Sequence, residues 1–250
     1  MRGYNEIDRS APLASSSMRD VATDMENAMI LAYALAAALA WSSGLRLYLA
    51  VFLAGLAGRS GLVVLPGALH VLSSPWIIGA AVVLATAEFA ADKISPLDSL
   101  WDALHTFIRI PAGAVMACAA FGHAEESSTL IAAGALGASL AGASHLTKAG
   151  VRALINLAPV PVTNGMASWF EECIVVGGLT LALLAPGVFL ALLFAFLIVS
   201  AWVLPRLWRG VHHGYHAMST RMVPARIRTD RGYRSPPTGE RDTARRRSGD

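Results

Sequence analysis

Four side chains that can carry a charge or a proton recur on one face of a predicted helix after Ser95-Pro96. They are Asp98, Asp102, His105 and Arg109, at positions i, i+4, i+7 and i+11. This spacing follows one stripe of a helix with 3.6 residues per turn. Asp98 also lies three residues after Ser95, where an acidic residue caps a helix, so it is alternatively a capping residue. Such a stripe can bind a solute, carry protons or form internal ion pairs.

Further along the chain, basic and polar residues form a second, complementary stripe. They are His145, Lys148, Arg152 and Asn156, at positions i, i+3, i+7 and i+11. Five charged residues and one asparagine flank the two stripes, and they complete the candidate polar path or substrate-binding site. They are Arg46, Glu88, Asp92, Asn164, Glu171 and Glu172. We expect Glu88 and Asp92, one turn apart before the first stripe, to supply its partners.

The elements that hold these charges are apolar enough to lie in lipid. Of 250 residues, 55% are hydrophobic and only 15% are charged, whereas a soluble domain carries roughly a quarter charged residues. A charge at membrane depth costs between about 3 and 10 kcal/mol unless it is paired or hydrated. Both stripes are therefore expected to face protein or water. The sequence predicts a polytopic membrane protein whose interior is either a polar path or an ion-pair network that fixes helix register.

The apolar windows predict an all-α, polytopic transmembrane helical bundle of about six spans. Two short broken or re-entrant helices are expected in addition. One lies within 28–58, where Ser42-Ser43-Gly44 and Arg46 interrupt an apolar run, and the other follows Gly150-Val151-Arg152. Interrupted segments at matching places in two halves are typical of transporters, so we interpret the two Gly-x-Arg elements as equivalent points of an inverted repeat.

Composition divides the chain into three parts. Residues 1–26 form a polar N-terminal segment, 27–209 the transmembrane helical domain, and 210–250 a basic, disordered tail. Arginines beside the last span favour the cytoplasmic side and are attracted to anionic lipid, so we expect no nucleic-acid partner. An even number of spans then places both termini in the cytoplasm. The predicted location is the bacterial plasma (inner) membrane.

Four stretches of the chain carry a resemblance to a known family. They are "SGLRLYLAVFLAGLAGR", "AEFAADKISPLDSLWDALHTFIRIPAGA", "HLTKAGVRALIN" and "SWFEE". On these motifs the sequence resembles the bacterial integral membrane family catalogued as domain of unknown function 4126. The family usually has Ser-Pro-Glu-Pro where this chain has Ala158-Pro159-Val160-Pro161, so one carboxylate of the family pattern is absent. The resemblance implies a membrane class and topology, and it implies no activity.

Three functions fit these features. The first is a small transporter or channel-like protein for a polar or anionic solute, with Arg46 and Arg152 at the broken-helix ends. The second is a membrane-embedded hydrolase or transferase acting on lipid phosphate, in which Arg109 would hold the phosphate. Its Mg²⁺ or Mn²⁺ would be held by Glu88, Asp92, Asp98, Asp102 and His105. The third is a structural membrane scaffold.

We expect no cofactor and no resident metal ion, and we favour a protein without enzymatic activity. The lipid bilayer and a small polar or anionic solute are the expected partners, and a homo-oligomer is left open.

Overall fold

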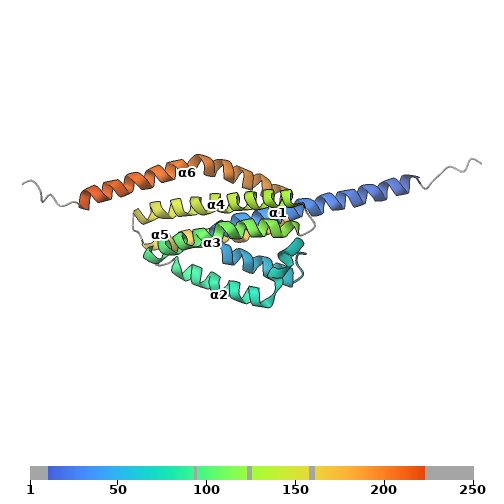
Figure 1. Cartoon of the computed structure of the whole chain (residues 1–250), viewed down its shortest axis with the longest axis horizontal. Coiled ribbons are helices and arrows are strands. Elements are labelled where there is room, and N and C mark those ends of the chain that lie inside the picture. Colours follow the sequence, from blue (N-terminus) through green and yellow to red (C-terminus); the bar gives the residue numbers. More distant parts are fainter. Residues whose placement is uncertain (1–10, 93–94, 123–125, 158–160, 223–250) are drawn as a thin grey trace, which may run out of the picture. The chain divides into compact units, whose positions relative to one another are not determined.

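Long runs of alanine and leucine form helices in this chain because both residues have high helix propensity and little polar surface. The computed structural model describes residues 11–92, 95–122, 126–157 and 161–222, in places by the backbone alone. Six α-helices and one 3-10 helix (η1) make up this part of the chain (Figure 1). Their bounds are α1 (Ala11–Arg59), η1 (Gly67–Ser73), α2 (Pro75–Ala91), α3 (Ser95–Phe121), α4 (Ser127–Leu157), α5 (Pro161–Leu184) and α6 (Pro186–Met222).

The helices are long and apolar enough for a membrane. Among the described residues, segments of α1, α3, α4, α5 and α6 each meet the length and hydropathy of a span, and η1 with α2 adds a sixth if that pair, bent by 73°, counts as one. The prediction of an all-α, polytopic transmembrane bundle is therefore confirmed.

The predicted break in the first apolar run is confirmed at Arg46. Its backbone has φ −145° and ψ 77°, which no helix contains, so α1 consists of two helical pieces. Leu31 and Leu35 line the same cavity as Leu53 and Ala54. A straight helix would separate Leu35 from Leu53 by about 27 Å at 1.5 Å per residue. The two pieces of α1 therefore fold back on each other, as Figure 1 shows.

The second predicted break, at Gly150, is wrong. α4 runs without interruption from Ser127 to Leu157, so Gly150 and Arg152 are ordinary helical positions. The next described residue after Leu157 is Pro161, where α5 begins, so the described residues contain no re-entrant helix between α4 and α5. Glycine alone costs a helix only about 1 kcal/mol, and the Leu207 side chain of α6 lies beside Gly150. The two Gly-x-Arg elements are thus locally different, and an inverted repeat is not confirmed.

Helices α1, α3 and α4 pack closely at glycines. A Cβ on Gly137 would meet the Gly113 carbonyl across the α3–α4 contact, and one on Gly44 would meet Ser144 and the Ala141 carbonyl across the α1–α4 contact. The contact loosens along α4: a Cβ on Gly134 would lie 3.0 Å from the Cys118 sulfur of α3, whereas one on Gly142 would have its nearest neighbour at 3.9 Å. The helix is rotated so that Gly137 faces α3.

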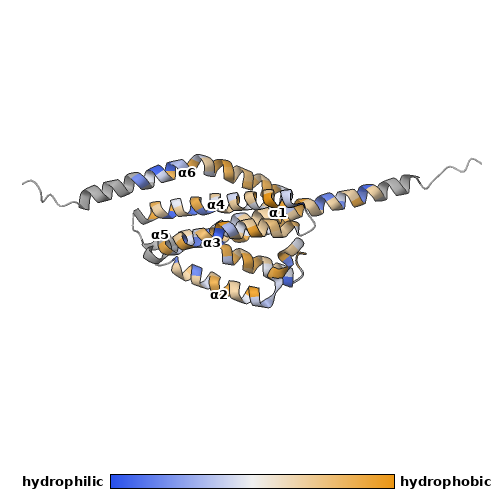
Figure 2. Cartoon of the chain, in the orientation of Figure 1, coloured by the Kyte–Doolittle hydropathy of each residue, from blue (hydrophilic) through white to orange (hydrophobic). Residues whose placement is uncertain are grey.

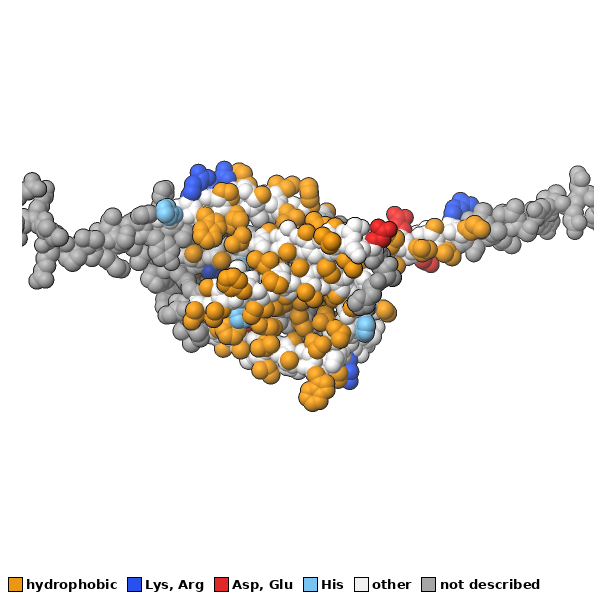
Figure 3. Space-filling view, in the orientation of Figure 1, with side chains coloured by type: hydrophobic (Ala, Val, Ile, Leu, Met, Phe, Trp, Pro, Cys, Tyr) orange, Lys and Arg blue, Asp and Glu red, His pale blue; other side chains and the backbone are white. Residues whose placement is uncertain are grey.

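The outside of the bundle is apolar and the charge is inside. Figure 2 shows mainly hydrophobic positions along the central helices, and the face in Figure 3 is dominated by hydrophobic side chains. Large residues such as Trp76, Phe107 and Phe194 are more than half exposed, whereas Arg46, Glu88 and Arg109 are at most 1% exposed. This distribution is the reverse of that in a water-soluble domain, and it suits a lipid environment.

Candidate functional site

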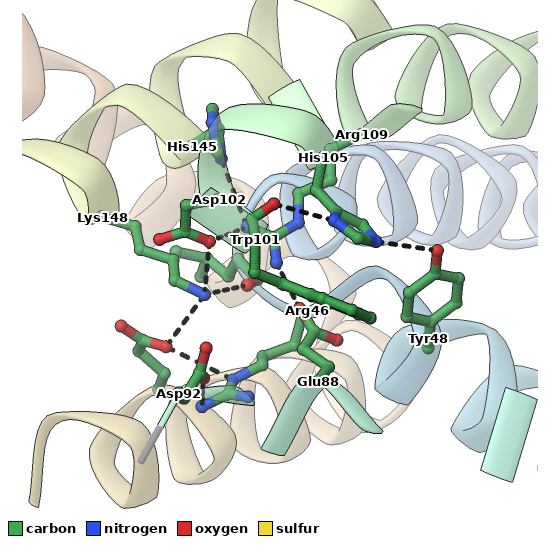
Figure 4. A network of polar contacts seen from close by, with 12 residues as sticks. Arg46, Tyr48, Glu88, Asp92, Trp101, Asp102, His105, Arg109, His145 and Lys148 are labelled. Atoms are coloured by element: carbon green, nitrogen blue, oxygen red, sulfur yellow. Dashed lines mark hydrogen bonds and ion pairs between the residues drawn. The ribbon is translucent and has the colours of Figure 1, made fainter. Parts of the chain in front are cut away.

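Eight charged side chains from five parts of the fold meet inside the bundle (Figure 4). They are Arg46 of α1, Glu88 of α2, Asp92 just after α2, Asp102 and Arg109 of α3, Lys148 and Arg152 of α4, and Glu171 of α5. Four are cations and four are carboxylates, so the formal charge of these eight is balanced. We call this set the charge network.

The first part of the network surrounds Arg109. Its guanidinium donates to Asp102, with Nη1 2.9 Å from Oδ1, and forms a short ion pair with Glu88. The seven-residue spacing along α3 places Asp102 on the same face as Arg109, as predicted. Glu88 arrives from the end of α2. Arg109 thus holds two carboxylates on two helices.

The second part joins Arg46 and Arg152, which share the same two carboxylates. Asp92 Oδ2 lies 2.6 Å from Nη2 of Arg46 and 3.4 Å from Nη2 of Arg152. Glu171 receives a two-pronged contact from Arg152, with both N–O distances 3.1 Å, and its Oε2 lies 3.3 Å from Nε of Arg46. Ser168 accepts from both arginines, through its hydroxyl and its carbonyl. α5 therefore presents acceptors to α1 and α4 together.

Lys148 links the two parts and donates a hydrogen bond to a backbone carbonyl at the break in α1. Its ammonium lies 3.5 Å from Asp102 and 3.3 Å from Glu171, and it donates to the Leu45 carbonyl at 3.1 Å. Leu45 directly precedes the non-helical Arg46, so this carbonyl lies at the break in the helix. An unsatisfied backbone carbonyl costs several kcal/mol in lipid. One lysine thereby ties the break in α1 to the carboxylates of α3 and α5.

Two histidines flank the network and belong to different environments. His145 accepts from Arg109 through Nδ1 at 3.3 Å, so its Nε2 donates to the Thr106 hydroxyl at 2.7 Å in the neutral tautomer. His105 donates from Nδ1 to the Trp101 carbonyl at 2.8 Å, which leaves Nε2 to accept from the Tyr48 hydroxyl at 3.1 Å. The Trp101 ring stacks on His105. Within the described chain, His105 joins no ion pair.

Several buried polar atoms of the network are left without a hydrogen bond among the described residues. They are Arg46 Nε, Arg109 Nε, Glu88 Oε2 and Asp92 Oδ1. Arg46 Nε is within ion-pair distance of Glu171, but the angle does not make a hydrogen bond. Buried polar groups are nearly always paired, because leaving one unpaired costs about 1 to 3 kcal/mol. The network thus retains donors and acceptors for further partners.

The structure brings most of the predicted site residues together. Besides the eight members of the network, His145 contacts Arg109, while His105 lies to one side with Tyr48. Glu172 is half-buried and joins none of the ion pairs found in the described part. The side chains of Asp98, Asn156 and Asn164 lie outside the described residues.

Sequence reasoning missed the neutral members of the site, namely Tyr48, Trp101, Thr106 and Ser168. Thr106 adjoins His105 on α3, and Ser168 precedes Glu171 by three residues, so helical spacing could have indicated Ser168. Tyr48 carries no such signal. It reaches His105 only because α1 turns back at Arg46.

The proposed metal-binding set is not assembled in the described part of the chain. There, no group of three or more His, Cys, Asp or Glu side chains is arranged to hold a metal ion. Asp92 and Asp102 instead face guanidinium groups, and His105 bonds to Tyr48. A carboxylate neutralised by arginine is a poor ligand for Mg²⁺ or Mn²⁺. The geometry therefore gives no support to metal-dependent chemistry on lipid phosphate.

Three cavities in the described part of the chain lie away from the charges. One, of about 480 Å³, is lined by apolar residues of α1 and α5, among them Leu31, Leu53 and Leu179. Two further cavities, at Trp41 and at Tyr33, are also mainly apolar. No member of the charge network lines any of these three cavities.

A comparison with family models matched one described as "Domain of unknown function (DUF4126)" over residues 33–206. This range covers more than half of the chain and contains the whole charge network. No curated protein and no solved structure matched the chain.

Proposed function

The chain belongs to the DUF4126 family, whose description assigns no activity, and from the charge network we propose that it is a small transporter or channel-like protein for a polar or anionic solute. The observation that carries this proposal is the enclosure of four cations and four carboxylates between helices of membrane-spanning length. Intramembrane ionisable residues mark solute or ion pathways by default.

Stability alone is a poor reason for such a network. Desolvating each ion costs several kcal/mol, and replacing a buried ion pair by well-packed apolar residues is often neutral or stabilising. A helix register could be fixed by one polar pair. Some buried polar atoms of the network form no hydrogen bond in the described structure, namely those of Arg46, Glu88, Asp92 and Arg109. They favour a site that binds and releases a solute over a purely structural network.

An anionic or polar solute is favoured by the position of the two shared arginines. Arg46 lies at the helix break and Arg152 on the facing helix, and both contact Asp92 and Glu171. Two guanidinium groups converging on the same carboxylates are suited to recognising an oxyanion through paired N–H donors. The carboxylates would act as counter-charges when the site is empty.

The membrane placement belongs to this proposal. We assign the protein to the bacterial plasma membrane, with the end of α6 in the cytoplasm, because Arg206 and Arg209 are exposed there and positive residues are retained on that side.

The test is solute flux into proteoliposomes by Arg46→Gln and Arg152→Gln variants. Each carboxylate that loses one arginine keeps the other, so we expect folded, inserted proteins whose flux falls by about 10- to 100-fold, the effect of losing one charged hydrogen bond. Lysine at either position should restore only part of the flux, because it keeps the positive charge but lacks the paired N–H donors of the guanidinium group. Arg59→Gln is the matched control, since Arg59 is exposed at the end of α1.

Small carboxylates, chloride, phosphate and neutral polar solutes form the panel. If no solute crosses or stabilises the wild type, and the glutamine variants unfold in mild detergent, the network is structural. The scaffold function would then replace the transporter.

A further inference from the structure

Glu171 differs from the other carboxylates of the charge network in its exposure. Its side chain is 13% exposed, whereas those of Asp92, Glu88 and Asp102 are 0%, 1% and 8% exposed. It is also the one member of the network that α5 contributes. Glu171 can therefore leave the network by moving its own side chain, with the two helices that hold its partners unchanged.

Glu171 contacts more cations than any other carboxylate in the described part of the network. Arg152 meets both of its oxygens at 3.1 Å, and Arg46 and Lys148 each lie 3.3 Å from Oε2. These three cations come from α1 and α4, and Arg46 lies at the helix break itself. Together they surround one carboxylate group, which Arg152 contacts through two N–H donors and which Arg46 and Lys148 each contact at one oxygen.

The charge of the site selects the occupant. With Glu171 in place, the four cations and four carboxylates of the network balance. A monoanion that replaced Glu171 would keep this balance, whereas a dianion would leave an excess negative charge in a low-dielectric interior, which is costly. A neutral solute would leave four cations with three carboxylates, and thus an excess positive charge in the same interior.

We propose that Glu171 is a built-in occupant of a binding site for a small carboxylate anion, which the solute takes over when the Glu171 side chain moves out. This inference rests on the proposed transport function and names its substrate class. The site consists of Arg46, Lys148 and Arg152, with the Ser168 hydroxyl 2.9 Å from Arg152 as a further polar contact.

The experiment is chemical rescue of Glu171→Ala. The variant is purified in mild detergent, and its Tm is measured in sodium formate, acetate, chloride and phosphate at equal sodium concentration. We expect formate and acetate to raise the Tm by at least about 2 to 4 °C above its value in chloride, as for a ligand that contributes roughly one further kcal/mol to a chain of this size. Phosphate should act less than either carboxylate.

Two matched variants separate binding from general salt effects. Glu172→Ala removes the neighbouring, half-buried carboxylate that joins none of the described ion pairs, so it should show no carboxylate-specific shift. Asp92→Ala removes a carboxylate that is fully buried, so formate should not reach its place. An equal rise in all three variants, or none in Glu171→Ala, would overturn the inference.

If Glu171→Ala does not yield folded protein, Glu171→Gln decides. The glutamine side chain has the shape of glutamate without its negative charge, so it should compete less strongly with the solute for the three cations. We expect half-maximal stabilisation by acetate at a concentration at least about tenfold lower than in the wild type, the effect of about 1.4 kcal/mol less competition. An unchanged concentration counts against the inference.

The outcomes also separate the inference from the transport function. Carboxylate rescue of Glu171→Ala without flux through the wild type would keep the binding site and remove the transporter. Flux of other solutes without carboxylate rescue would keep the transporter and remove this site.

Discussion

At the scale of single residues, the members of the charge network differ in how many partners remain when one is lost. Glu88 has Arg109 as its one cationic partner in the described part of the chain, whereas Asp102 has both Arg109 and Lys148. Arg109 in turn holds Glu88 and Asp102. Removing Arg109 therefore leaves Glu88 without a cation in the described network, whereas removing either carboxylate leaves Arg109 with the other one.

We predict that Arg109→Ala lowers the free energy of unfolding by about 3 to 5 kcal/mol, because it leaves Glu88 buried and unpaired. Asp102→Ala should cost less, since Arg109 keeps Glu88 and Lys148 keeps Glu171. The double variant Arg109→Ala with Asp102→Ala should recover part of the Arg109→Ala loss. Equilibrium unfolding in mixed detergent micelles measures all three. Strictly additive losses would mean that the pair does not interact.

At the scale of helices, the break in α1 depends on a close contact with α4. Gly44 lies against Ser144 and the Ala141 carbonyl, and Ser144 donates to the Trp41 carbonyl at 2.7 Å. Lys148, one turn further along α4, donates to the Leu45 carbonyl. Both bonds supply donors to backbone carbonyls near the break, which lipid could not do. The reversal of α1 is thus held by α4.

We predict that Gly44→Ala destabilises the protein by about 1 to 3 kcal/mol, the usual cost of overpacking. A Cβ there would meet backbone atoms of α4, which cannot move aside without separating the two helices. Gly177→Ala on α5 is the control, because its Cβ would meet nothing within 4 Å. It should be neutral or slightly stabilising through its higher helix propensity. Equal effects of the two substitutions in thermal unfolding would show that the α1–α4 contact is not tight.

At the scale of the whole described bundle, the reversal of α1 leads us to expect a topology different from the one that the sequence predicts. Two cytoplasmic termini require an even number of crossings. Because α1 turns back, we expect it to add no net crossing, and with α2 counted as a span we expect five crossings from α2 to α6. Consistent with this, Leu31 of α1 lies beside Leu184 at the end of α5, whereas Leu207 of α6 lies against Gly150 at the level of the network. The parts of α1 around Leu31 and of α6 around Leu207 thus lie toward opposite ends of the bundle.

We therefore expect one exposed end of the described chain on each side of the membrane. Single cysteines at Asp24 and Arg209, in a variant without the native Cys118 and Cys173, report this through labelling by a membrane-impermeant maleimide in intact cells. Asp24→Cys should be labelled, and Arg209→Cys should be protected until the cells are opened. Protection of both positions would restore the prediction of two cytoplasmic termini.

The sequence by itself determined the membrane class, the all-helical bundle and the residues that make up the charge network. Charges are so unfavourable in lipid that their positions in apolar runs, such as Arg109 and Lys148, require them to face inward. Helical spacing then places Asp102 with Arg109 and Lys148 with Arg152, because that periodicity is a property of each helix alone.

Only the tertiary structure decided which helix breaks and which charges pair. Gly44-Leu45-Arg46 and Gly150-Val151-Arg152 are alike in sequence, yet α1 breaks and α4 continues. The break is stabilised by the Lys148 donor from another helix, and a sequence does not reveal how far two helices are rotated toward each other. The same rotation makes Glu171 the meeting point of three cations and brings Tyr48 to His105. Contacts between helices, unlike the spacing within one, exist only after the bundle has formed.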